Sequence, residues 1–137
     1  MIEFSLIAFL KGNQNIAGIV GPRIYPDVIP NGSANYPAVA IQTISDVREY
    51  TMAGESGPVY VRIQVSSWAR SRTVARQLDD AIRQLLSGYS GTAASDTIQS
   101  SFAQNRRDVV EPDPENEAAR VYGCQRDFLI GFTEPNP

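Results

Sequence analysis

Carboxylates are the side chains whose number and spacing could support chemistry in this 137-residue chain. Asp79 and Asp80 are adjacent in a segment of helical periodicity, so they point in different directions, and we expect both on a solvated helix face. Acidic side chains also alternate from Glu111 to Glu117. Carboxylate oxygens suit Ca²⁺, but this run lacks the spacing and the glycine of an EF-hand loop. We therefore expect a solvated hairpin loop, with metal binding as the alternative.

Other reactive residue types are scarce. The chain has no histidine and a single cysteine, Cys124. This removes the commonest general base and excludes both an internal disulfide and a cysteine zinc site. The sequence also lacks a G-x-S-x-G nucleophile motif and a glycine-rich loop ahead of a helix for a phosphate. We expect a protein that is not an enzyme, with no catalytic residues, cofactor or metal, and Cys124 as a buried inert thiol rather than a reactive one.

Composition and charge place the chain among single-domain proteins, residues 1–137, with residues 133–137 as a flexible tail. The net charge of −3 argues against a dedicated nucleic-acid binder. Arg106 and Arg107 make only a weak basic patch. An arginine–carboxylate network within or between subunits is the favoured interpretation, and nucleic-acid contact is the alternative. The apolar N-terminal run has no basic segment before it and is too short to span a bilayer, so synthesis in the cytoplasm is expected.

The clearest structural pattern is a strand that leads directly into a helix. Residues 59–68 alternate apolar and polar side chains, as in a half-buried strand. Ser71 then precedes apolar residues at helical spacing, and Gly88 follows them, so a helix is predicted over 72–87. Trp68 closes the strand, where we expect it in the core or between helix and sheet, with an exposed binding anchor as the alternative.

Weaker patterns complete the predicted architecture. Helices are expected over 2–11 and from Asn13 to Val20, and strands near 23–25, over 38–46, 97–109 and 120–132. A hairpin with its tip at Gly54–Gly57 should join the second and third strands and project as an arm. Ile98, Ser100 and Phe102 should share one strand face, and the final strand should present Cys124 and Phe128 on one face that Arg126 interrupts. The class is α+β, with a mostly antiparallel four- to five-stranded sheet and two main helices packed on one face.

The order of several segments resembles the bacteriophage tail-completion or tail-terminator family of long-tailed phages. The resemblance covers about residues 4–132, and no single segment is diagnostic. The segments that carry it are Arg23–Pro26, Tyr36–Val39, Arg48–Gly54, Val61–Trp68 with the helix after it, and Arg106–Glu111 with the final strand.

This resemblance implies a structural virion protein without catalytic residues. Family members form a ring, typically of six subunits, at the head-proximal end of the tail. The ring caps the tail tube, ends its polymerisation and offers a docking surface to the head connector or head-completion protein, while DNA only passes through the lumen and no membrane is involved. The alternatives are a head-closure or head–tail adaptor protein and, from another class, a small enzyme or ligand-binding α+β domain.

A ring requires two unlike patches on each subunit. The helix over 2–11 is apolar on most of its circumference, so its second face should be covered, either because the helix lies deep in its own domain or, as the alternative, by a neighbouring subunit. The arm over 47–58 could reach a neighbour or, as the alternative, end in solvent, and arginines could pair across the seam with acids such as Asp46 or Asp127. The candidate residues for a subunit or tail interface are Phe4, Ile7, Arg48, Tyr50, Met52, Arg62 and Arg126.

Overall fold

A computed structural model describes residues 2–29, 36–51, 54–93, 96–113 and 116–133, without side chains for residues 47–51, 54–58 and 116–118. The described chain forms three helices and one six-stranded sheet in the order β1-β2-β3-β6-β5-β4. The helices are α1 (Ile2–Lys11), α2 (Gln14–Val20) and α3 (Arg72–Leu86). The strands are β1 (Ile24–Pro26), β2 (Ala38–Thr51), β3 (Gly54–Ala69), β4 (Gly91–Ala93), β5 (Asp96–Asp113) and β6 (Asn116–Thr133).

The α+β class is confirmed, but the sheet differs in detail from the predicted one. It has six strands rather than four or five, and it is mixed, because β1 pairs with β2 in parallel. The strand missing from the prediction is β4, whose three residues lie in a segment of small side chains that shows no alternation. A third helix, α2, joins the two main ones.

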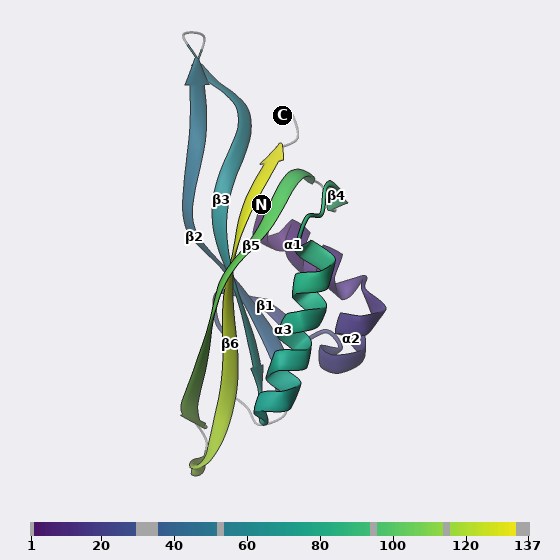
Figure 1. Ribbon diagram of the computed structural model, residues 1–137, viewed down its shortest axis with the longest axis vertical. Helices are drawn as coiled ribbons and strands as arrows, with labels where there is room; N and C mark the ends of the chain where they lie inside the picture. The colour runs from purple at the N-terminus through teal and green to yellow at the C-terminus, as the bar shows by residue number, and fades with distance from the viewer. Residues whose placement is uncertain (1, 30–35, 52–53, 94–95, 114–115, 134–137) are drawn as a thin grey trace.

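Two hairpins extend the sheet in opposite directions (Figure 1). The arm of β2 and β3 continues to Thr51 and resumes at Gly54, so Gly54–Gly57 belongs to a strand and is not the tip. The hairpin of β5 and β6 likewise continues to Asp113 and resumes at Asn116, so most of the acidic run is strand rather than loop. Pairing extends because backbone hydrogen bonds need no particular side chains. Thr133 also belongs to β6, whereas residues 134–137 lie outside the described part of the chain.

All three helices lie on one face of the sheet, where the hydrophobic core forms (Figure 1). Local signals set the helix ends as expected: Asn13 accepts a hydrogen bond from the Ile16 amide at 3.2 Å, and Ser71 from the Val74 amide at 3.2 Å. Gly88 follows α3 with φ of 76°, a left-handed conformation that favours glycine. None of the described helices is long and apolar enough to cross a membrane.

Helix α1 connects both sides of the curled sheet. Thr43 of β2 donates a hydrogen bond to Glu3, and Ser5 donates to Asp96 of β5 at 2.6 Å. Leu6 and Leu10 of the same helix are fully buried. Because β2 and β5 lie near opposite edges of the sheet, contacts to both mean that the sheet curls around this helix.

A register shift in β5 overturns one predicted strand face. Between Ile98 and Ser100 one strand gains a residue relative to its partner. A shift of one residue moves every later side chain to the other face. Ile98 is therefore buried under the helices, whereas Phe102 is 59% exposed. The prediction that Ile98, Ser100 and Phe102 share a face is wrong for this reason.

Candidate functional site

A buried ion pair connects helix α3 to strand β6. Arg126 donates from Nε to Asp79 Oδ1 at 3.0 Å and from Nη2 to Oδ2 at 2.9 Å, and its Nη1 donates to the Gln104 carbonyl oxygen at 3.1 Å. The hydrogen bonds to Asp79 are the main cause that raises the pKa of Arg126. The predicted solvated position of Asp79 is wrong, because the helix face that carries it meets the sheet.

The adjacent acid, Asp80, forms an ion pair within the helix instead. Arg83 Nε lies 3.8 Å from Asp80 Oδ1, three residues earlier in the chain. Asp80 remains exposed, as expected for one member of the adjacent acid pair. Neighbouring carboxylates on a helix thus have different environments because only one of them faces β6.

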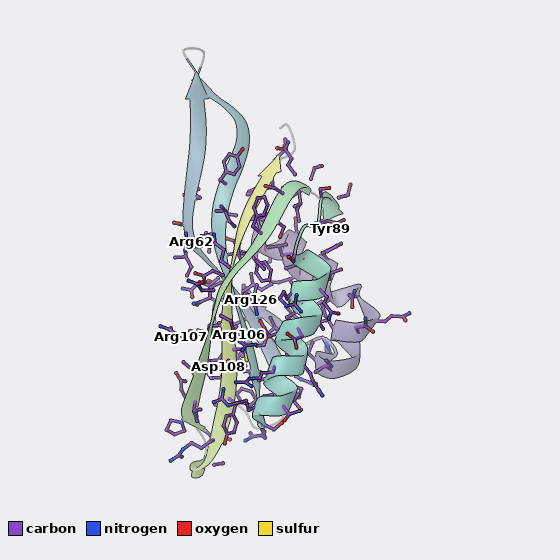
Figure 2. All side chains as sticks on the ribbon, viewed as in Figure 1. Arg62, Tyr89, Arg106, Arg107, Asp108 and Arg126 are labelled. Atoms are coloured by element: carbon purple, nitrogen blue, oxygen red, sulfur yellow. The ribbon has the colours of Figure 1, made fainter. Side chains whose placement is uncertain are left out.

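Asp108 of β5 forms ion pairs with three arginines next to the Arg126–Asp79 pair. Its carboxylate lies 2.9 Å from Arg76, 3.4 Å from Arg72 and 3.5 Å from Arg106. The hydrogen bond from Arg76 lowers the pKa of Asp108. Arg106 also lies 3.8 Å from Asp79, so the predicted arginine–carboxylate network is confirmed for Arg106, within one subunit. Figure 2 shows Arg106, Asp108 and Arg126 beside α3.

Cys124 is fully buried next to this network. Its thiol donates to Asp108 Oδ1 with a 3.3 Å separation. Burial, and then this hydrogen bond to a carboxylate, raises the pKa of Cys124 to about 11. The thiol is therefore protonated at neutral pH, and because the thiolate is the nucleophile, the geometry favours the inert interpretation.

The opposite face of the sheet carries no helix among the described residues. Arg62 lies 3.6 Å from Asp127 there, and Arg107 donates to Gln125 at 2.7 Å. Figure 2 shows Arg62 and Arg107 away from α3. Trp68 pairs with Gly123 on this face. The expectation that Trp68 lies between helix and sheet is therefore wrong.

A shallow cavity of about 290 Å³ lies on the helix-free face near Trp68. Its polar lining includes Asp27, Gln64 and Glu111, and Val28 and Tyr36 add apolar surface. The polar lining side chains are amides, hydroxyls and two acids, a set suited to contact rather than to activating a nucleophile.

The seven predicted interface residues fall into three groups. Phe4 is 55% exposed and Arg62 is also accessible, so both can meet a partner. Ile7 is buried in the core, and Arg126 is held by Asp79, so neither presents the free surface that was expected. The backbones of Arg48 and Tyr50 lie in the β2 arm, their side chains are not among those described, and Met52 lies outside the described residues.

Among the exposed apolar side chains on the strands, sequence reasoning missed Ile44 and Phe102. Ile44 lies at the register shift of β2 between Thr43 and Ser45, and Phe102 follows the register shift of β5 between Ile98 and Ser100. A sequence read with strict alternation has no signal for an extra residue, so neither position could be found without the pairing of the strands.

These features define a small α+β domain whose ion pairs hold helix to sheet and whose helix-free face and arms are available for contact. A family model described as "Tail completion protein gp17" matches residues 5–122. The chain belongs to this family, which confirms the resemblance seen in the sequence. It is a tail-completion protein, a structural component of a phage virion tail.

The fold also matches a solved structure. A chain in a structure titled "Virion of native gene transfer agent (GTA) particle" aligns with a TM-score of 0.68 and 13% sequence identity, covering 95% of this chain and 94% of that one. At this identity the likeness shows the fold alone. No curated protein sequence matches the chain.

Proposed function

We propose that this protein forms a closed ring, with six copies as the resemblance implies, at the head-proximal end of the phage tail. The ring caps the tail tube, ends its polymerisation and presents a docking surface to the head-connector or head-completion protein. In this role the protein is structural rather than enzymatic and uses no cofactor or metal. Synthesis takes place in the cytoplasm of the bacterial host.

The observation that carries this proposal, beyond family membership, is the pair of opposed hairpins in Figure 1. In a ring of like-oriented copies, every β2–β3 arm would extend from one rim and every β5–β6 hairpin from the other. The second rim would be rich in acids, because the sequence from Glu111 to Glu117 alternates carboxylates. Two chemically unlike rims suit a component that meets a tube on one side and a connector on the other.

DNA enters this proposal only as cargo that passes through the lumen. The chain has a net charge of −3, and the described arginines of the helix-free face have partners, Arg62 with Asp127 and Arg107 with Gln125. Tight binding to phosphate needs several unneutralised basic side chains. The net negative charge of the chain, with Arg62 paired to Asp127, supports passage without retention.

The decisive experiment is electron microscopy of particles from a strain that lacks this gene. Overlong tails without heads are the result expected for a terminator. Tails of normal length beside leaking heads would instead indicate the head-closure or adaptor role, and normal infectious particles would remove both.

The arm can be tested by charge reversal. Arg48→Glu should prevent assembly onto tails while the purified protein keeps its circular dichroism spectrum and melting temperature. Lys11→Glu makes the same change of charge at an exposed position at the end of α1 and should assemble normally. Normal assembly of the Arg48 variant would exclude the arm from the interface.

A further inference from the structure

We propose that adjacent copies in the ring meet through Ile44 of one subunit and Phe102 of the next. The inference rests on the proposed function, since it names the seam of that ring. The partner is a second copy of this chain, which contributes the opposite edge of its sheet. The contact is apolar and lies at the middle of the strands rather than at either arm.

The two side chains are exposed and lie at the same level of the sheet. Ile44 is 49% exposed and Phe102 is 59% exposed. Strand register places one row of paired residues across the sheet next to both of them. This row consists of Thr43, Ile63, Phe128 and Ala103. Ile44 follows the first member of the row and Phe102 precedes the last, so they occupy matching heights on strands near opposite edges.

Both strands are accessible from the side at this level. β1 pairs with β2 only at Val39–Ile41, and β4 pairs with β5 only at Asp96–Ile98. Among the described residues, no strand pairs with the outer side of β2 beyond Ile41 or of β5 beyond Phe102. Exposed strand edges are sites where other chains add.

Bulges decide what kind of contact these edges can make. β2 shifts register between Thr43 and Ser45, and β5 between Ala103 and Arg106, directly beside Ile44 and Phe102. A bulge disrupts the regular ladder and redirects a side chain. A long intersubunit ladder is therefore disfavoured, and side-chain packing is the contact that remains.

Symmetry supports a second copy as the occupant. β2 is antiparallel to β3, β3 to β6, and β6 to β5, so β2 runs antiparallel to β5. Rotation about an axis along the strands conserves height, so it brings Phe102 of one copy to the level of Ile44 of the next. Such a contact joins two different patches, as ring closure requires. A different protein that bound one edge would not need a matching apolar side chain at the same height on the other.

Paired cysteines test the seam in assembled tails. In the double variant Ile44→Cys/Phe102→Cys, a short bifunctional maleimide should link copies into a ladder that ends at the ring size. Ile44→Cys/Val110→Cys is the control, because Val110 is comparably exposed on the same strand but lies at a different level and on the face that carries the helices. Native Cys124 is buried and should not react in either variant.

The outcomes separate this inference from the proposed ring. A ladder in the Phe102 variant and not in the control supports the seam. Equal linkage in both, or none in either, while particle microscopy still shows a multi-copy ring, overturns the seam and leaves the ring. Tails that carry no multi-copy ring overturn the proposed function and the seam together.

A second variant tests the same contact without cross-linking, in case the maleimide reaction itself fails. Phe102→Asp should reduce the fraction of protein assembled on tails about tenfold or more, because each contact in the ring loses an apolar partner. The isolated protein should keep its melting temperature, since the side chain is mostly exposed. Wild-type assembly of this variant, measured on the same tails, would reject the contact.

Discussion

Arg126 and Asp127 are adjacent in β6, yet their ion pairs lie on opposite faces of the sheet. Arg126 and Asp79 are 2.9 Å apart, with side-chain exposures of 12% and 3%. Arg62 and Asp127 are 3.6 Å apart, with exposures of 45% and 27%. Strand alternation sends the first pair under α3 and the second toward solvent. Two pairs of the same chemistry therefore have different roles, one holding the fold and the other available to partners.

The physical reason for the difference is solvation. A buried charge loses hydration and is stable only with good geometry and further hydrogen bonds, which Arg126 obtains from Asp79 and the Gln104 carbonyl oxygen. An exposed pair keeps most of its water and gains little when it forms. The comparison predicts unequal effects of mutation on the two faces.

Removal of the buried acid should have the largest effect. Asp79→Ala leaves Arg126 buried without its partner, so the free energy of unfolding should fall by about 3–5 kcal/mol in urea denaturation. The double variant Asp79→Leu/Arg126→Met removes both charges and should be less destabilised than the single one. A loss below about 1 kcal/mol for Asp79→Ala would contradict the structural role of this pair.

A methyl group at Gly123 tests packing on the helix-free face. Its added Cβ would lie 2.8 Å from ring atoms of Trp68, so Gly123→Ala should cost about 1–3 kcal/mol of unfolding free energy. Gly18→Ala in α2 meets nothing within 4 Å and should stabilise by roughly 0.5–1 kcal/mol. Trp68→Ala should relieve the penalty at Gly123. An unaffected Gly123→Ala protein would show that the ring moves freely.

Acid should weaken the network on the helix side through Asp108. The hydrogen bond from Arg76 lowers the pKa of this carboxyl, so its contribution is complete above the ordinary value of about 4 and is lost as the pH falls through the lowered value. Asp108→Asn should cost about 1 kcal/mol at neutral pH. It should also reduce the fall in stability between neutral pH and pH 3, as urea titrations at several pH values would measure. If the stability of Asp108→Asn fell with pH as steeply as that of the wild type, Asp108 would not be a cause of the loss of stability in acid.

The exposed pair should show the smallest effect on stability. Arg62→Ala should change the unfolding free energy by about 0.5 kcal/mol or less, because the pair is solvated. The same variant can alter assembly if this face meets a partner, which co-sedimentation with tails would report. A destabilisation as large as that of Asp79→Ala would erase the difference between the faces.

Much of the fold was predictable from local patterns. The alternation over 59–68 identified β3, Ser71 and Asn13 identified helix starts, and the final strand was correctly expected to carry Arg126 on its apolar face. The arms were longer than expected because side-chain alternation ends before backbone pairing does. The bulges beside Ile44 and Phe102 were not predictable, since an extra residue has no compositional mark.

The sequence by itself determined the class of fold, the helix ends and the family resemblance, because these depend on neighbours along the chain. Its composition also showed that catalytic residue types are scarce. Only the tertiary structure decided that Asp79 is buried against Arg126. It also decided that Ile44 and Phe102 lie at the same height on strands near opposite edges of the sheet. Those outcomes depend on strand order and register, which bring together residues remote in sequence. The partner of a charge, and hence its solvation, is a property of that arrangement.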